Sequence, residues 1–411
     1  MARVFGRIGI LSFGGPAAQI ALMHRELVEE RPWLEDQTFL RALSLCMMLP
    51  GPEAMQLATY CGWRLRGVTG GLIAGGLFVL PGALVIAALV WLYAAYGDLP
   101  LVSAAFLGIK AAVIAIVLQA LIRLSGRAFP KSDGPWLAGM AFLAIFALNL
   151  PFPVIIAAAA FWGWVQADTV TDTAPVARPS GLGVLRIVTL WGGLWLLPLA
   201  VLSVTGPVLL ADLGWFFAKL AVVTFGGAYA VLAYMTQTVV SDYGWLTTGQ
   251  MIDALGLAET TPGPLILVTQ FVAMLTTQLQ GGVGLALAAG LVALWATFVP
   301  CFLWIFLAGP YVDWIAVQPR LAGALQAVTA AVVGVIANLS LWFALHVIFA
   351  DLTQLGFGPV QMPWPVWSSL DPSAVILTGL AAVLLLPLKR GPAEVLALMA
   401  AAALGLSFVM A

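Results

Sequence analysis

The sequence predicts an all-α polytopic membrane protein made of two homologous, inverted repeats, each containing broken or re-entrant helices. Three observations predict this fold. The chain of 411 residues is 62% hydrophobic and only 9% charged, whereas about a quarter of the residues in a soluble domain are charged. Apolar stretches long enough to cross a bilayer follow one another along the chain. A block near the N-terminus returns 212 residues later, with its helix-breaking residues at the same spacing.

The composition also excludes several classes of function. A net charge of -1 provides no basic face, so no nucleic-acid partner is expected. The three cysteines and two histidines are scattered along the chain, which predicts no disulfide framework, no metal site and no cofactor. An enzyme would need a nucleophile with its base, or a cluster of acids, inside the apolar region. The sequence shows neither, so we expect no enzymatic activity.

The predicted transmembrane segments define the domain boundaries. The first repeat covers residues 1–167, a polar linker covers 168–186, a connecting transmembrane segment covers 187–204, and the second repeat covers 205–411. A spanning helix needs about 20 apolar residues. Besides the connecting segment, the candidate apolar segments are 5–23, 37–63, 68–96, 101–123, 135–150, 153–167, 213–235, 249–278, 283–309, 319–346, 373–387 and 393–411.

The distribution of positive charge predicts how the repeats are oriented. Cytoplasmic loops collect Lys and Arg. With a cytoplasmic N-terminus, Arg64 and Arg66 lie inside and the acid-rich loop 24–36 lies outside. Seven segments then precede the second copy of the block, which predicts that the two repeats run in opposite directions. In transporters with inverted repeats the binding site lies where the repeats meet, near the middle of the bilayer.

A Phe-Gly-Gly motif after a hydroxyl residue occurs once in each repeat. In the first copy Ser12 precedes Gly14 and Gly15, and in the second copy Thr224 precedes Gly226 and Gly227. Adjacent glycines open a helix and expose backbone N–H groups, and an exposed helix N-terminus binds anions. The alternative is close packing of helices through small residues. The duplication favours a binding role.

A Pro-Gly-Pro motif is also duplicated. The first copy starts with Pro50-Gly51, and the second starts with Pro262-Gly263 after Thr261. Prolines this close remove backbone donors and stop a helix, so broken helices or re-entrant pairs are expected. A simple kink is the alternative. Polar side chains lie beside both motifs, and Gln56 and Gln270 are further binding candidates.

Charged side chains near the motifs complete the candidate site. Arg7 and Lys219 occupy the same repeat position, which favours an anionic substrate, although each side chain can also reach the headgroups. Glu53 and Glu259 flank the Pro-Gly-Pro motifs, and a carboxylate in a membrane segment is a functional candidate. With His24, just past the first segment, they are candidates for proton coupling. Capping of a helix end or a hydrogen bond is the alternative for each.

The motif set resembles the chromate transporter family, in its long two-domain form. The matching segments include Phe13-Gly14-Gly15-Pro16, His24-Arg25-Glu26-Leu27 and Leu49-Pro50-Gly51-Pro52-Glu53-Ala54. Thr224-Phe225-Gly226-Gly227 and Thr261-Pro262-Gly263-Pro264 resemble the C-terminal repeat of that family. The resemblance implies a secondary transporter of the cytoplasmic membrane that exports chromate by alternating access and confers chromate resistance.

Several alternatives remain open at this point. Sulfate has the shape and charge of chromate, so the chain can instead transport sulfate or another anion without a role in chromate resistance. An anion channel is a further alternative. Antiport against protons is one form of coupling consistent with the candidate carboxylates. Membrane transporters often pair as symmetric dimers, so a homodimer embedded in the lipid bilayer is expected.

Overall fold

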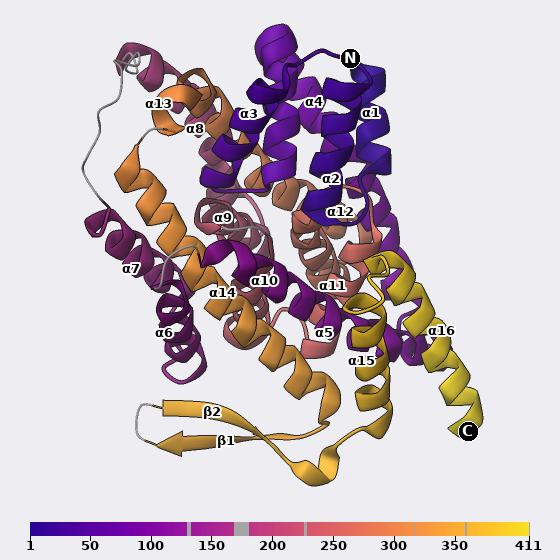
Figure 1. Cartoon of the computed structure of the whole chain (residues 1–411). Coiled ribbons are helices and arrows are strands. Elements are labelled where there is room, and N and C mark those ends of the chain that lie inside the picture. Colours follow the sequence, from indigo (N-terminus) through magenta and orange to yellow (C-terminus); the bar gives the residue numbers. More distant parts are fainter. Residues whose placement is uncertain (130–132, 168–180, 226–227, 317, 358–359, 411) are drawn as a thin grey trace. The chain divides into compact units, whose positions relative to one another are not determined.

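Two compact units make up the chain, and each draws on both halves of the sequence. The computed structural model describes residues 1–129, 133–167, 181–225, 228–316, 318–357 and 360–410, most of them helical (Figure 1). Unit 1 comprises Met1–Ala94, Ala167–Val231 and Thr261–Ala322. Unit 2 comprises Ala95–Gln166, Leu232–Thr260 and Gly323–Ala411. The expected repeats 1–167 and 205–411 therefore each contribute to both units.

Unit 1 contains the helices that surround the duplicated motifs. Its α8 packs along α12, where the Trp195 indole donates a hydrogen bond to the Ala296 carbonyl at 3.0 Å. The elements of unit 1 are α1 (Ala2–Leu11), α2 (Gly15–His24), the π-helical turn η1 (Arg25–Glu29), α3 (Asp36–Met48), α4 (Glu53–Tyr96), α8 (Gly181–Thr205), α9 (Val208–Val223), η3 (Leu265–Leu267), α12 (Val268–Ala308), η4 (Gly309–Tyr311) and α13 (Val312–Ala316).

Unit 2 is organised around α5, with α15 and α16 packed along it (Figure 1). It also holds an antiparallel hairpin, with Leu352 opposite Pro365, which the all-helical expectation did not include. The elements that lie wholly or mainly in unit 2 are α5 (Pro100–Ala128), α6 (Gly134–Phe146), α7 (Phe152–Val165), α10 (Ala228–Gln237), η2 (Thr238–Asp242), α11 (Thr248–Thr260), α14 (Pro319–Ile348), β1 (Leu352–Phe357), β2 (Val360–Pro365), η5 (Trp367–Ser369), α15 (Pro372–Leu385) and α16 (Pro392–Met410).

Helix boundaries recur at the repeat offset of 212 residues. Adding 212 to the bounds of α3 gives the bounds of α11, and adding 212 to the last residue of α1 gives the last residue of α9. The start and end of α4 likewise match the start of η3 and the end of α12. The recurrence follows from the breakers. Leu49, before Pro50, adopts an extended conformation, as the residue preceding a proline usually does.

The long α4 is in fact two antiparallel helices joined by a tight turn. The turn lies at Arg66 and Gly67, where Gly67 has a φ of 61°. A Cβ on Gly62 would collide with the Gly70 carbonyl oxygen, and a Cβ on Gly75 would collide with the Thr59 hydroxyl. These pairs are spaced evenly about the turn, so residues 53–65 run back against residues 68–96.

The same arrangement recurs in α12, whose turn lies at Gly282 with a φ of 77°. The Thr269 and Thr297 hydroxyls are 3.3 Å apart. A Cβ on Gly290 would lie 2.8 Å from the Met274 sulfur. The expected segments 37–63 and 249–278 are therefore each two helices that meet at a Pro-Gly-Pro motif. The expected segments 68–96 and 283–309 correspond to the parts of α4 and α12 that follow their internal turns.

The expected first span, 5–23, also folds back on itself. The Arg7 guanidinium on α1 lies 3.6 Å from the Glu26 carboxylate, just after α2. In one continuous helix these residues would be separated by roughly 28 Å. α1 and α2 therefore form a helical hairpin with its tip at Ser12–Gly14. The expectation that loop 24–36 lies on the opposite side from the N-terminus is wrong, because the hairpin returns the chain to the side on which it began.

Five of the helical segments in the described part of the chain are long and apolar enough to cross a membrane. They are Glu53–Tyr96, Pro100–Gly126, Gly181–Thr205, Leu265–Ile315 and Pro319–Ile348. The third contains the expected connecting segment 187–204 and begins inside the expected linker 168–186, of which residues 168–180 lie outside the described residues. The predicted class, an all-α polytopic membrane protein, is confirmed.

Candidate functional site

The two kinds of motif meet in unit 1 through a reciprocal pair of backbone hydrogen bonds. The Gly51 N–H donates to the Thr224 carbonyl at 2.8 Å, and the Gly263 N–H donates to the Ser12 carbonyl at 2.9 Å. Ser12 and Gly51 form the tip of the first repeat, and Thr224 and Gly263, 212 residues later, form the tip of the second. Each Pro-Gly-Pro motif is therefore bonded to the hydroxyl motif of the other repeat, and the four predicted segments form one site.

Both hydroxyl side chains are engaged by their own helices. The Ser12 hydroxyl donates to the Ile8 carbonyl at 2.6 Å, and the Thr224 hydroxyl donates to the Leu220 carbonyl at 2.6 Å. Each bond satisfies a carbonyl in the last turn of α1 or α9, where intrahelical donors run out. In this conformation the two hydroxyls present lone pairs to the site, so donation to an anion requires them to rotate.

Glycine is required at the tips for conformational and steric reasons. Gly51 has a φ of 118° and Gly263 a φ of 90°, values that side chains disfavour. A Cβ on Gly51 would lie 2.8 Å from the Gln56 amide nitrogen and 3.1 Å from the Cys301 sulfur. Gly14 and Gly15 also have positive φ, and their predicted counterparts Gly226 and Gly227 lie outside the described residues.

The prolines end the helices while neighbouring segments pack against the exposed backbone. Pro50 supplies the carbonyl that accepts a bond from Gln56 at 2.6 Å. A Cβ on Gly82 would collide with the Pro262 carbonyl oxygen, so α4 passes directly against the second tip. Thr261, just before Pro262, is buried. The tips are thus enclosed by protein, as non-helical backbone at membrane depth must be.

Three buried glutamines lie beside the two tips, and the side-chain amide of each donates a hydrogen bond to a backbone carbonyl. Gln19 donates to the carbonyls of Ser12 at 3.2 Å and Gly263 at 2.7 Å, and Gln270 donates to Ala83 at 3.0 Å. Together with Gln56, they have side-chain oxygens that are buried and accept no hydrogen bond in the described structure. The sequence predicted Gln56 and Gln270 but missed Gln19, whose signal was an amide inside the apolar segment 5–23.

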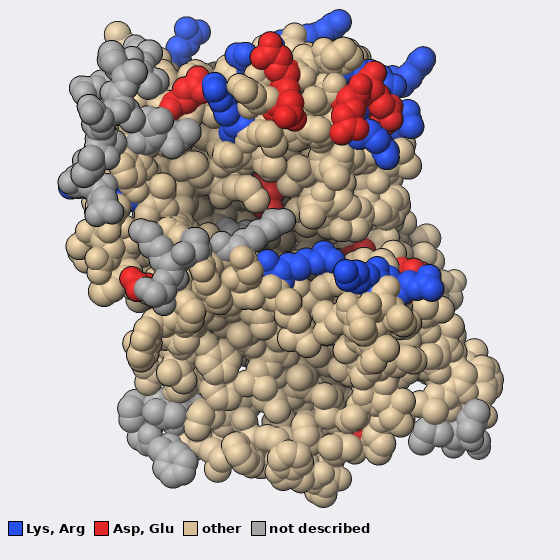
Figure 2. Space-filling model, viewed as in Figure 1, with Lys and Arg blue, Asp and Glu red and all other residues tan. Residues whose placement is uncertain are grey.

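The predicted cations lie on the correct helices but have different surroundings. Arg7 contacts Glu26, which is fully buried and also lies 2.5 Å from Arg31. Lys219 projects from an exposed position on α9. Charged side chains gather at one end of unit 1, over α1 to α3 (Figure 2). The ion pairs there include Arg7–Glu26, Arg31–Glu26, Arg31–Glu30, Arg25–Glu30, His24–Glu29, His24–Asp36 and Arg41–Asp313.

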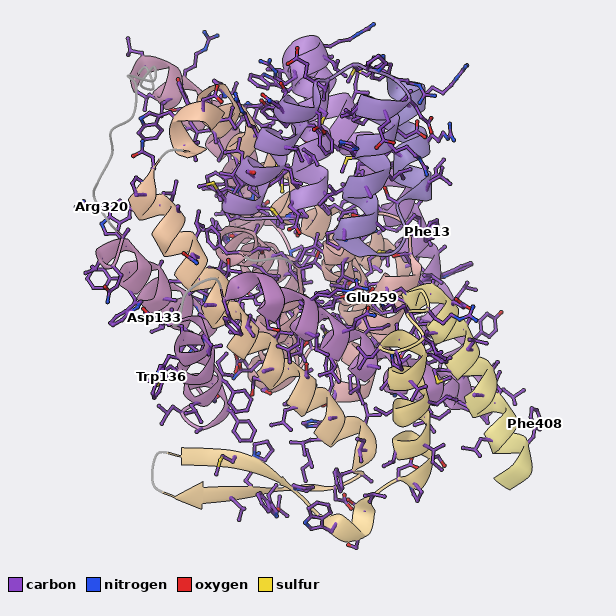
Figure 3. The ribbon with its side chains drawn as sticks, viewed as in Figure 1. Phe13, Asp133, Trp136, Glu259, Arg320 and Phe408 are labelled. Carbon is purple, nitrogen blue, oxygen red and sulfur yellow. The ribbon has the colours of Figure 1, made fainter. Side chains whose placement is uncertain are left out.

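The three predicted titratable groups occupy different places. Glu53 is half-buried in the first turn of α4, where a carboxylate is stabilised by the helix dipole. Glu259 is buried in the last turn of α11 (Figure 3). The ring nitrogens of His24 lie 2.7 Å from Asp36 and 3.0 Å from Glu29. The hydrogen bond with Asp36 raises the pKa of His24 above its usual value, and Glu29 adds to the effect while burial opposes it.

A charged pair in unit 2 was not predicted from the sequence. Lys110 on α5 lies 3.5 Å from Asp253 on α11, and the Asp253 side chain is 6% exposed. Asp253 was overlooked in the sequence. Its signal was a carboxylate in the apolar segment 249–278, which also contains Glu259.

Comparison with known proteins identifies the family. Residues 1–164 and 211–406 match the family described as "Chromate transporter". The chain belongs to this family. Membership confirms the resemblance carried by the motifs, and with the long apolar helices it confirms a multi-pass protein of the cytoplasmic membrane. It also confirms that the chain is a transporter rather than an enzyme.

Several relatives extend over most of this family member. A chromate transport protein from Cupriavidus metallidurans is 31% identical over 341 residues, covering 81% of this chain and 79% of the relative. A probable chromate transport protein from Synechococcus elongatus is 29% identical over 405 residues, covering 93% and 94%. A chromate transport protein from Pseudomonas aeruginosa is 33% identical over 342 residues, covering 81% and 77%. No solved structure matches the chain.

Proposed function

We propose that this chain is a secondary transporter that exports chromate, or a sulfate-like oxyanion, across the cytoplasmic membrane by alternating access and so confers chromate resistance. The observation that carries the proposal is the reciprocal bonding of the two tips, Gly51 to Thr224 and Gly263 to Ser12. Two broken segments from equivalent places in two repeats are the usual location of a transporter's binding site. The names of the relatives favour chromate as the substrate.

We further propose that the two repeats are inverted. Equivalent helices are α4 residues 68–96 and α12 residues 283–308. Gly71 and Gly75 lie against Phe306 and Phe302, whereas Val90 and Trp91 share a cavity with Val283 and Leu287 at the other end. Equivalent helices thus run antiparallel, as two copies related by an axis in the membrane plane would.

The proposed anion contacts come mainly from backbone. The N–H groups of Gly51 and Gly263 are occupied in this conformation, so the donors that remain for an anion are the first-turn N–H groups of α2 and α4, which have no intrahelical acceptor. Ser12 and Thr224 add donors if their hydroxyls rotate. Arg7 and Lys219 supply positive charge from the equivalent helices α1 and α9. Glu53, Glu259 and His24 remain the candidates for proton coupling.

An anion channel is the alternative, and transport against a gradient separates the two. The test is chromate flux into proteoliposomes, with sulfate as competitor and with or without an imposed pH gradient. The proposal expects saturable flux that sulfate inhibits and that a pH gradient drives beyond equilibrium. Flux that only dissipates a chromate gradient would indicate a channel. Absence of both chromate and sulfate flux would exclude the proposed substrates.

The same assay tests the role of Glu53 with a matched control. Glu53→Gln is expected to remove the stimulation by the pH gradient, because the side chain can no longer exchange a proton. Glu394→Gln changes another carboxylate, one that is exposed and paired with Arg390 at 3.0 Å, and should behave like the wild type. If Glu53→Gln also retains its full response to the gradient, Glu53 has no part in coupling.

A further inference from the structure

The pair formed by Lys110 and Asp253 places two opposite charges inside apolar helices of unit 2. The ammonium and the carboxylate oxygen are 3.5 Å apart, with side-chain exposures of 26% and 6%. The helical segment Pro100–Gly126, which contains Lys110, includes an 18-residue stretch with a mean hydropathy of 2.5. Ionisable groups inside membrane-spanning helices are costly and usually take part in substrate or proton movement.

Small residues on α11 bring α5 close to this pair. Gly249, Asp253 and Gly256 follow the i, i+4, i+7 spacing of one helix face. A Cβ on Gly256 would collide with the Ile109 side chain, and a Cβ on Gly249 would lie 3.3 Å from the Lys110 ammonium. The two glycines therefore leave room for α5 on both sides of Asp253. Lys110 reaches the first turn of α11, one turn before Asp253.

A purely structural role explains the pair poorly. Apolar residues of similar volume often replace a buried ion pair at no cost in stability, whereas loss of one partner strands the other charge. The chain also contains a contrasting pair, Arg41–Asp313, at 3.1 Å with side-chain exposures of 60% and 62%. Arg41 occupies the repeat position of Asp253, so the two repeats carry opposite charges at one equivalent position.

The charged surroundings of Asp253 in the described structure are few. Among the described residues, α5 and α16 make the main helix contacts of α11. On α5 the charged residues are Lys110, Arg123 and Arg127, and on α16 the single one is Glu394, which pairs with Arg390. Glu259 lies six residues further along α11, on a different face. Lys110 is in ion-pair contact with Asp253 at 3.5 Å.

We propose that Asp253 is a protonation site and that Lys110 is the cation it releases to the transported oxyanion. The inference rests on the proposed function. When Asp253 carries its charge, the Lys110 ammonium is held by the carboxylate. Addition of one proton to the carboxylate neutralises it, and the ammonium then contacts an anion oxygen. Release of the anion restores the ion pair and returns the proton to water.

The scheme fixes the charge that accompanies the substrate. Proton and anion occupy the protein together, so a dianion leaves with one proton and a net charge of -1. An inside-negative membrane potential still favours export of that charge. Apparent affinity for the anion should rise as pH falls, because protonation of Asp253 is linked to anion binding.

The test compares reconstituted wild type with Asp253→Asn, Lys110→Gln and the double variant, from mildly acidic to mildly alkaline pH. The probe is sulfate, which stays a dianion across this range, alongside chromate. Asp253→Asn is expected to bind with high affinity at every pH. Lys110→Gln is expected to weaken affinity by about tenfold or more, the ratio produced by loss of a charge-assisted hydrogen bond.

The double variant, which strands no charge, decides between function and packing. The proposal expects it to fold but to have weak affinity without pH dependence. If the pair only holds α5 to α11, the double variant will keep the wild-type affinity and pH profile, and the proposal is overturned. Arg41→Gln with Asp313→Asn is the matched control and should leave both quantities unchanged. Wild type without sulfate or chromate flux would instead refute the proposed function.

Discussion

Replacement of Gly51 by alanine is the sharpest test of how closely the two tips are packed. The residue has a φ of 118°, and a side chain held in such a conformation costs about 1–3 kcal/mol. The added Cβ would also lie 2.8 Å from the Gln56 amide nitrogen. Displacing that group breaks its bond to the Pro50 carbonyl, which adds about 0.5–1.5 kcal/mol. Gly51→Ala should therefore destabilise the protein by about 1.5–4.5 kcal/mol.

The assay is thermal or denaturant unfolding of the purified protein in detergent, followed by flux in proteoliposomes. The matched control is Gly76→Ala, because Gly76 has an ordinary helical backbone and its Cβ would meet no atom within 4 Å. That variant should retain wild-type stability and flux. If Gly51→Ala is as stable and as active as Gly76→Ala, the crossing does not have the tight geometry described, and the reasoning fails.

Three further predictions use other residues of unit 1. Ser12→Ala and Thr224→Val should each reduce the free energy of unfolding by a similar amount, about 0.5–1.5 kcal/mol, because they lose equivalent bonds; clearly unequal losses in denaturant unfolding would contradict this. Because the pKa of His24 is raised above 6.5, its pairing stabilises the protein fully below pH 6.5 and is lost as pH rises through the higher folded value. His24→Asn should abolish that part of the pH dependence of thermal stability, and an unchanged profile would refute it. Glu26→Gln should destabilise the protein towards the lower end of about 3–5 kcal/mol, because Glu26 is fully buried while both arginines are partly exposed; a melting temperature equal to that of Asp313→Asn would contradict this.

The positions of the helix ends could be predicted because they depend on local rules. Pro50 restricts the residue before it, and Gly51 and Gly263 permit backbone conformations that other residues avoid. The direction in which the chain continues after each break depends on contacts between residues far apart. Hydropathy therefore read residues 5–23 as one span, while the contact of Arg7 with Glu26 shows two helices folded together.

The partners of polar residues were the least predictable part of the site. Hydropathy assigns a value to each residue separately, so Asp253 was one unfavourable residue in an apolar segment until α5 placed Lys110 beside it. Gln19 was missed for the same reason, because its acceptor Gly263 lies 244 residues away in the sequence. The repeat offset contained part of this information, since it related Ser12 to Thr224 and Gly51 to Gly263 before any contact was known.

The reciprocal bonds between the tips also affect how an empty carrier behaves. Parting the tips would take the Gly51 and Gly263 N–H groups away from their acceptors, and in a dry apolar setting each lost bond is worth about 4–6 kcal/mol. Thermal motion alone would rarely break both hydrogen bonds. A bound oxyanion offers its own oxygens to the released donors and so lowers that barrier. On the proposed mechanism, these two bonds keep the empty carrier closed, so small ions do not leak across the membrane when no oxyanion is bound.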